Sequence, residues 1–139
     1  MKRRKPLKRS PMPPRTSWLP RVSKKRRQLM AKVKPFRDKY LASKLLCEVC
    51  IKRQPQEVHE ITRGAAREAS LDKPEVVLAV CRHCHRQLDD YARWPVTRQL
   101  AVKFLRSPLL LNLELVNKLR GRDYNAITMD DVVQHLELA

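Results

Sequence analysis

The amino-acid sequence predicts a mainly α-helical fold that contains one small β-hairpin. Two short segments of strand length lie between two Cys-x-x-Cys pairs: residues 57–61, and the wholly apolar residues 76–80. Apolar residues at helical spacing occupy the last third of the chain, after Pro95 and again after Pro108. At 139 residues, the chain is long enough for one domain with a terminal extension.

Residues 1–22 are predicted to form a disordered, basic and proline-rich arm, because proline disfavours regular elements and like charges repel one another. Residues 1–46 hold 17 Lys and Arg and one acid, a net charge of +16, whereas residues 47–139 have a net charge of only +1. Positive charge gathered in this way favours a polyanionic partner. Nucleic acid is the commonest such partner, with ribosomal RNA or an acidic membrane surface as alternatives.

Residues 23–46 are predicted to form two helices, the first basic and the second amphipathic. Ser23 can cap a helix from Lys24 to Val33. Pro35 is expected to interrupt that helix and to stand in the first turn of the next one, which runs to about Leu46. The apolar face expected for this second helix consists of Phe36, Tyr40, Leu41 and Leu45.

Residues 47–92 are expected to form the central unit, in the order strand, loop, strand, helix. The two strands are residues 57–61 and 76–80, and a turn or loop is expected at Arg63–Arg67. The helix is expected from Cys81 to about Tyr91.

Residues 93–139 are predicted to form three helices that bury a small core beside this unit. The second of them is expected to end before Gly121. Thr128-x-x-Asp131 resembles a capping box and would open the last helix. The inward-facing side chains expected in the last helix are Val132, Val133 and Leu136.

All four cysteines belong to the two Cys-x-x-Cys pairs, which are separated by thirty residues: Cys47, Cys50, Cys81 and Cys84. The chain has no apolar run long enough to span a membrane and no apolar signal-peptide core, so a cytoplasmic protein is expected. In that compartment paired cysteines are metal ligands more often than disulfides. Four thiolates complete a tetrahedral zinc site with no open position, which predicts a structural zinc. Four unliganded buried cysteines are the less favoured alternative.

A second metal site is predicted from two histidines. His59 lies in the first predicted strand, and His85 lies in the predicted helix, four residues after Cys81. If the helix packs on the hairpin, the two imidazoles converge and can hold one divalent ion. Such an ion, with a nearby general base, can activate a water molecule to attack a phosphodiester.

Four arginines surround the predicted second site: Arg63, Arg67, Arg82 and Arg86. The planar guanidinium group suits phosphate, so at least one of them is expected to bind the backbone of a nucleic acid. Their alternative role is salt bridging to the acids Glu60, Glu68 and Asp89.

The cysteine pairs, the segment Val-His59-Glu60-Ile and the helix start Cys-x-x-Cys-His85 together resemble the HNH endonucleases, which share a ββα-metal (His-Me finger) fold. The resemblance covers about residues 47–90 and is closest to phage-type and small bacterial members, including their Arg-Gly-x-x-Arg segment. It implies that double-stranded DNA is cut or nicked with Mg²⁺, Mn²⁺ or Ni²⁺ at His59 and His85, in the host cytoplasm if the protein is phage-encoded. It implies no particular protein partner.

Two positions depart from the family pattern. The family strand ends in an ion-binding residue followed by a general-base histidine, so by position His59 would bind the ion and Glu60 replaces the base. Either Glu60 is the base, or Glu60 helps to bind the ion while His59 takes the proton; a histidine pKa near 6.5 favours the latter. The family's middle asparagine, which orients the base, corresponds to Val76.

These departures keep two further functions open beside the endonuclease. One is a zinc-stabilised nucleic-acid-binding protein that is catalytically weak or inactive. The other is an RNA-binding, ribosome-associated zinc protein, which the basic arm permits.

Overall fold

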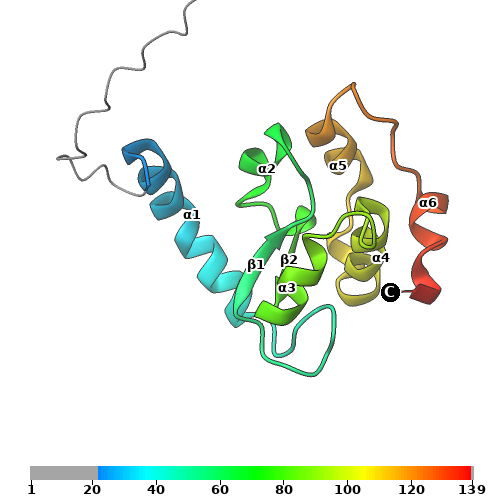
Figure 1. Ribbon diagram of the computed structural model, residues 1–139, viewed down its shortest axis with the longest axis horizontal. Coiled ribbons are helices and arrows are strands. Elements are labelled where there is room, and N and C mark those ends of the chain that lie inside the picture. Colours follow the sequence, from blue (N-terminus) through cyan, green and yellow to red (C-terminus); the bar gives the residue numbers. More distant parts are fainter. Residues whose placement is uncertain (1–21, 139) are drawn as a thin grey trace, which may run out of the picture.

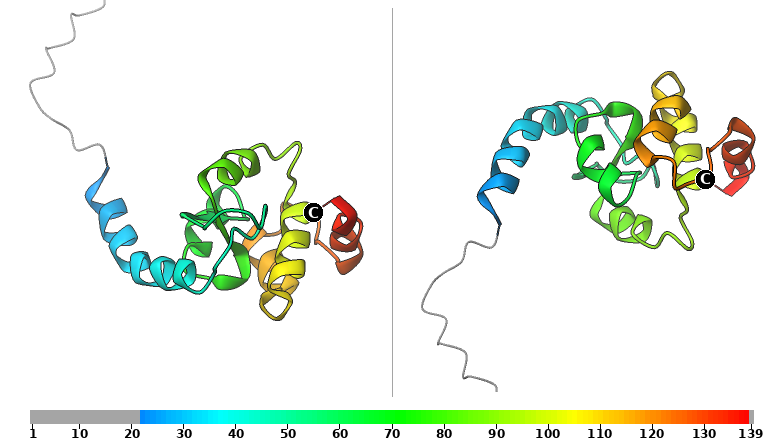
Figure 2. Two further views of the ribbon diagram at one scale, coloured as in Figure 1. Left: turned by 90° about the horizontal axis from the view of Figure 1, so that it is seen from below. Right: turned by 90° about the horizontal axis from the view of Figure 1, so that it is seen from above.

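The computed structural model describes residues 22–138, so the arm predicted for residues 1–22 lies almost entirely outside the described residues. The described chain is mainly helical and contains one two-stranded antiparallel sheet, as the sequence predicts (Figure 1). The sheet lies between the long helix α1 (Lys24–Ala42) on one side and the C-terminal helices on the other, and this arrangement is visible in all three views (Figures 1 and 2). No helix within the described range is long and apolar enough to cross a membrane.

The sheet consists of β1 (Glu57–Glu60) and β2 (Val77–Val80), with His59 opposite Leu78 in the register. Alternate side chains of a strand point to opposite faces. Leu78 and Val80 belong to the larger core, shared with the C-terminal helices, whereas Val58, Val77 and Ala79 pack against α1. The sheet is therefore covered on both faces, which explains why β2 is apolar throughout.

The connection between the strands is partly helical, where the sequence analysis expected a turn or loop. It contains α2 (Ala65–Ser70) and the 3₁₀ turn η1 (Pro74–Val76). Gly64 precedes α2 with a φ of 62°, a left-handed conformation that glycine adopts at little cost. The Ala-Ala-Arg-Glu-Ala sequence that follows is rich in strong helix formers, which explains the extra helical turn.

Helix α1 is continuous, so the predicted interruption at Pro35 is wrong. Proline removes one backbone hydrogen bond, but the packing of Tyr40 and its neighbours against the sheet stabilises the helix beyond it. The helix ends at Ala42 instead of Leu46. Leu45 therefore lies beyond the helix and is 88% exposed, in contrast to its predicted place on the apolar face.

The chain after β2 forms α3 (Arg82–Leu88), α4 (Val96–Arg106), the 3₁₀ turn η2 (Pro108–Leu110), α5 (Leu113–Arg120), α6 (Met129–Val133) and the 3₁₀ turn η3 (Leu136–Leu138). Helix α3 ends three residues before Tyr91. Gly121 follows α5 with a φ of 80°, and the predicted capping box of Thr128 and Asp131 is present at α6. Val132 is buried, but Val133 is 47% exposed, because adjacent helical residues point about 100° apart.

A buried polar network joins α1 and α4 to the sheet. The Nζ atom of Lys103, in α4, donates to the Tyr40 hydroxyl at 2.6 Å and to the Val77 carbonyl at 2.8 Å. The Tyr40 hydroxyl donates in turn to Glu48 Oε2 at 3.0 Å, and that oxygen also accepts from the backbone N–H of Ala79 at 2.7 Å. Glu48 and Lys103 are both buried, so each charge depends on these partners.

Replacement of Glu48 by alanine is expected to lower the free energy of unfolding by about 3–5 kcal/mol, because it leaves the buried Lys103 without its counter-charge and the Ala79 N–H without an acceptor. Urea unfolding of the zinc-loaded protein measures this loss. The exposed Glu68→Ala variant is the control and should change stability by less than about 0.5 kcal/mol. Equal effects of the two substitutions would show that the network contributes nothing.

Burial lowers the pKa of Lys103 from its ordinary value of 10.5 to about 8, and Glu48 only partly opposes this shift. Between these two pH values the unfolded chain binds the proton more tightly than the folded chain does, so this group makes the protein more stable as pH rises from 8 to 10.5. As pH rises from 8 to 10.5, the free energy of unfolding of the wild type should therefore increase relative to that of Lys103→Met. A difference that stays constant with pH in urea unfolding would contradict this expectation.

Candidate functional site

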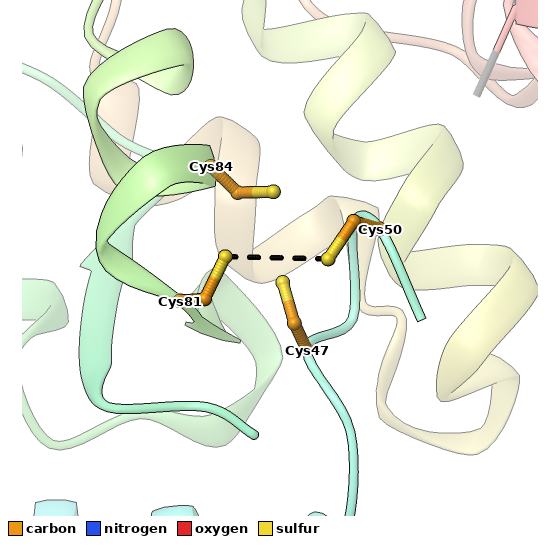
Figure 3. Close-up of side chains that lie close together, drawn as sticks. All are labelled: Cys47, Cys50, Cys81 and Cys84. Atoms are coloured by element: carbon orange, nitrogen blue, oxygen red, sulfur yellow. Dashed lines mark hydrogen bonds between the residues drawn. The ribbon is translucent and has the colours of Figure 1, made fainter. Parts of the chain in front are cut away.

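The four cysteine sulfur atoms form one cluster, in which all lie within 4.8 Å of one another (Figure 3). Cys50 Sγ and Cys81 Sγ are 4.0 Å apart. Four sulfurs at about 2.3 Å from a central zinc lie roughly 3.8 Å from one another, so this spacing fits one tetrahedral ion. None of the four is in a disulfide, so all four are available to bind zinc as thiolates.

The two cysteine pairs are brought together by different local structures. Cys47 and Cys50 lie on a tight turn, in which the Ile51 N–H donates to the Cys47 carbonyl at 3.0 Å and Ile51 has a φ of 55°. Cys81 is the N-cap residue of α3, so β2 leads directly into the second pair. The cluster thus joins the turn at residues 47–51 to the start of α3.

The electrostatics of the cluster also suit a cation. Burial raises the pKa of Cys47 and of Cys84, because a thiolate loses solvation there. Burial opposes ionisation of Cys50 too, but backbone N–H groups of Lys52 and Arg53 outweigh it and lower the Cys50 pKa to about 7. A divalent ion would offset the desolvation of the buried thiolates and their mutual repulsion.

His59, His85 and Asp89 form a second group of potential metal ligands, whose ligand atoms also lie within 4.8 Å of one another. The two imidazole rings meet edge to face, with centroids 5.1 Å apart. The group opens into a cleft of about 410 Å³ that Arg63 and Arg67 also line. Its donor set of two imidazoles and one carboxylate suits a divalent ion and leaves positions for water or substrate.

The local structure explains why these residues meet. His59 comes from β1, while His85 and Asp89 are four residues apart at the end of α3 and so lie on the same side of the helix. Helix α3 packs against β1, and its first turn belongs to the cysteine cluster. The cluster therefore fixes the position of the helix that carries two of the three residues.

His85 forms a hydrogen bond with the carboxylate of Glu57. Its Nδ1 atom is 2.5 Å from Glu57 Oε2 on β1. An ionised carboxylate can only accept a hydrogen bond, so Nδ1 carries a proton, and in the neutral ring Nε2 is then the unprotonated nitrogen. This carboxylate–histidine pairing is typical of metal ligands, because it fixes the ring and raises its basicity.

His59 is only 3% exposed, and its Nε2 atom is 2.9 Å from Oε1 of Gln99, a residue of α4. Burial lowers the pKa of His59, and the hydrogen bond to Gln99 only partly opposes this shift. Burial thus favours the neutral imidazole, which is the form that can bind a metal ion or accept a proton.

Glu60 has different neighbours from His59. It is buried, and it forms ion pairs with Arg37 of α1 at 3.1 Å and with Arg67 at 3.3 Å. Alternation along β1 directs Glu60 toward the face that α1 covers, whereas His59 faces α3 and α4. Glu60 thus lies at the edge of the cleft with two guanidinium groups rather than within the His and Asp group.

The four arginines named in the sequence analysis separate into two pairs. Arg63 and Arg67 line the cleft, and the Arg63 guanidinium lies over the Tyr91 ring, 3.8 Å from its centroid. Arg82 and Arg86 are exposed residues of α3 that do not line this cleft. Arg82 instead approaches Glu57, with a separation of 3.6 Å.

Three residues of this site were not assigned a role in it from the sequence: Glu57, Asp89 and Gln99. Asp89 carried a usable signal, because it follows His85 by four residues in a predicted helix. Gln99 carried none, since it is 40 residues from His59 in the chain and meets it only in the folded structure.

Comparison with known proteins finds no family model that matches the chain, no curated protein that is significantly similar and no solved structure that matches it. The four-cysteine cluster and the His and Asp group beside the hairpin are consistent with the resemblance to HNH endonucleases.

The cysteine cluster predicts one zinc ion per chain, bound with four thiolates. Cys84→Ala should abolish stoichiometric zinc binding and most of the folded structure, because metal affinity contributes directly to folding in so small a core. His83→Ala is the matched control, since His83 is exposed between Cys81 and Cys84 and should leave zinc binding intact. Elemental analysis and far-UV circular dichroism measure the two effects. Full zinc content in Cys84→Ala would contradict a four-cysteine site.

Proposed function

We propose that this chain is a metal-dependent DNA endonuclease or nickase of the HNH type. The observation that carries the proposal is the convergence of His59, His85 and Asp89 at a cleft that is also lined by arginines. Two imidazoles, a carboxylate and guanidinium groups together supply what phosphodiester hydrolysis needs: an ion site, a proton acceptor and phosphate binding.

In this proposal His85 and Asp89 bind the divalent ion, and His59 takes the proton from the attacking water. His85 suits a cation because the Glu57 carboxylate lies behind it. His59 hydrogen-bonds the neutral amide of Gln99 and not a carboxylate, so it suits a general base that accepts a proton and then releases it. When bound, Mg²⁺, Mn²⁺ or Ni²⁺ would stabilise the negative charge that develops on the leaving oxygen.

Arg63 and Arg67 are proposed to bind the phosphates beside the scissile bond. Both lie at the cleft, and a planar guanidinium can donate two hydrogen bonds to one phosphate. Glu60 acts through Arg67 in this scheme, because their ion pair orients the guanidinium at the edge of the cleft. Glu60 therefore assists catalysis without taking the proton itself.

Double-stranded DNA is the proposed substrate, and α1 is proposed to add affinity that does not depend on sequence. The exposed basic residues of α1 are Lys24, Lys25, Arg26, Arg27, Lys32, Lys34 and Lys39. Arg37 of the same helix hydrogen-bonds the Val58 carbonyl and pairs with Glu60, so the basic helix is attached beside the cleft. Binding that depends on several phosphate contacts weakens steeply as salt rises.

A nucleic-acid-binding protein without catalysis is the second candidate function. The position at which the HNH family carries its base histidine holds Glu60, whose charge is balanced by Arg37 and Arg67. If His59 does not accept the proton, the chain retains a zinc-stabilised basic surface and no general base.

Supercoiled plasmid incubated with Mg²⁺, Mn²⁺ or Ni²⁺ tests the proposal. His59→Ala and His85→Ala should each lower the nicking rate by at least about 100-fold, the usual contribution of a general base or an essential ligand. Asp89→Ala should weaken Mn²⁺ binding and the nicking rate together. His83→Ala, on the same helix and outside the group, should retain wild-type activity.

Two outcomes would contradict the endonuclease. The absence of nicked or linear plasmid with any of the three metals would favour the binding protein, provided that the DNA is still bound. Equal activity in the wild type and both histidine variants would indicate a contaminating nuclease. Glu60→Gln separates the two candidate bases: loss of nicking with unchanged DNA binding would assign the proton to Glu60 instead of His59.

A further inference from the structure

We infer that Gln99 is a positioning residue, which fixes His59 in the tautomer whose Nδ1 atom is unprotonated and available. The inference concerns the same site and rests on the proposed function for its catalytic meaning. Its basis is the set of hydrogen bonds that Gln99 makes inside the core, between α4, α3 and β1.

The orientation of the Gln99 amide follows from its other two partners. Its nitrogen lies 2.8 Å from the Trp94 carbonyl and 3.3 Å from the Leu88 carbonyl. Both carbonyls are acceptors only, so the group that faces them must be the NH₂ donor. The amide oxygen therefore faces His59, and it can only accept a hydrogen bond.

The tautomer of His59 follows in turn. The His59 Nε2 atom is 2.9 Å from this amide oxygen, so Nε2 carries the proton. In the neutral ring Nδ1 is then unprotonated, and it is the nitrogen that can bind an ion or accept a proton. The opposite tautomer would place an Nε2 lone pair against the amide oxygen and leave a buried acceptor unsatisfied.

Gln99 is well suited to hold this arrangement, because it is fully buried. Its neighbours Leu100, Ala101 and Val102 belong to the apolar core, and within it the Gln99 amide has three protein partners. A reversed amide would set its oxygen against the carbonyl oxygens of Leu88 and Trp94, whichever nitrogen of His59 carried the proton. Two such contacts between acceptors are unfavourable in a buried site.

The same side chain also holds the other half of the group. Leu88 is the last residue of α3 and directly precedes Asp89, and Trp94 lies in the loop that leads into α4, two residues before its start. Gln99 therefore connects the histidine of β1 with the end of the helix that carries His85 and Asp89. A single buried amide sets both the proton position on His59 and the place of its partners.

Nitrogen-15 NMR of the histidine rings in the full chain, loaded with zinc and free of other metals, tests the inference directly. At a pH where the ring is neutral, wild-type His59 should show a protonated Nε2 and an unprotonated Nδ1. Gln99→Met, similar in size but with no acceptor, should lose this preference. Gln99→Glu retains an oxygen that accepts from Nε2, although its ionised carboxylate has no N–H to donate to the two carbonyls. This variant should keep the tautomer. Gln87→Met, an exposed change on α3, is the control.

Mn²⁺ affinity and plasmid nicking should both fall by about 10- to 100-fold in Gln99→Met, the usual cost of removing a group that orients a metal-site residue. Zinc content should not change. Gln99→Glu should recover part of both losses, which a purely structural role of Gln99 would not produce.

An unchanged His59 tautomer in Gln99→Met would overturn the inference, and so would loss of the tautomer in Gln99→Glu. If Gln99→Met does not fold, the result for Gln99→Glu decides alone. If the wild type cuts no DNA but the His59 tautomer still changes in Gln99→Met, the positioning role is supported and the endonuclease is overturned. The two proposals can therefore fail separately.

Discussion

The four-cysteine cluster is the constraint on which the rest of the site depends. It joins the turn at Cys47–Cys50 to the first turn of α3. A helix of seven residues has little stability of its own in water, so its position must come from such contacts. Once Cys81 and Cys84 are fixed, His85 and Asp89 can extend from the same helix toward β1. The predicted zinc site is therefore also what places the second group of ligands.

Buried polar contacts supply the remaining precision. In the core, Gln99 contacts His59, and the network of Tyr40, Glu48 and Lys103 joins α1 and α4 to the sheet. At the half-buried edge of the sheet, Glu57 pairs with His85. Apolar packing alone would tolerate small shifts of α4 against the hairpin. Directional hydrogen bonds in a medium of low dielectric tolerate much less, because a broken bond leaves an unsatisfied group inside the protein. The polar side chains of α4 thus give the small core a defined geometry around the cleft.

The alternation of a β-strand separates two neighbouring residues into different environments. His59 and Glu60 are adjacent in β1, yet His59 meets His85, while Glu60 meets Arg37 and Arg67. From the sequence alone, either of the two residues could take the proton. The neighbours of His59 are potential metal ligands, whereas the neighbours of Glu60 are two arginines. The division of roles proposed above follows from that difference.

The mainly helical fold with its hairpin, the four-cysteine cluster and the capping box at Thr128 could all be predicted from the sequence, because each is encoded by residue types at short, fixed spacings. Three other features emerged only from the folded structure: α1 continues through Pro35, Leu45 is exposed and Gln99 meets His59. These features depend on contacts between segments far apart in the chain, where packing outweighs local preference. The segment from Cys47 to Asp89 contains most of the residues of the site, and α4 positions His59 through Gln99.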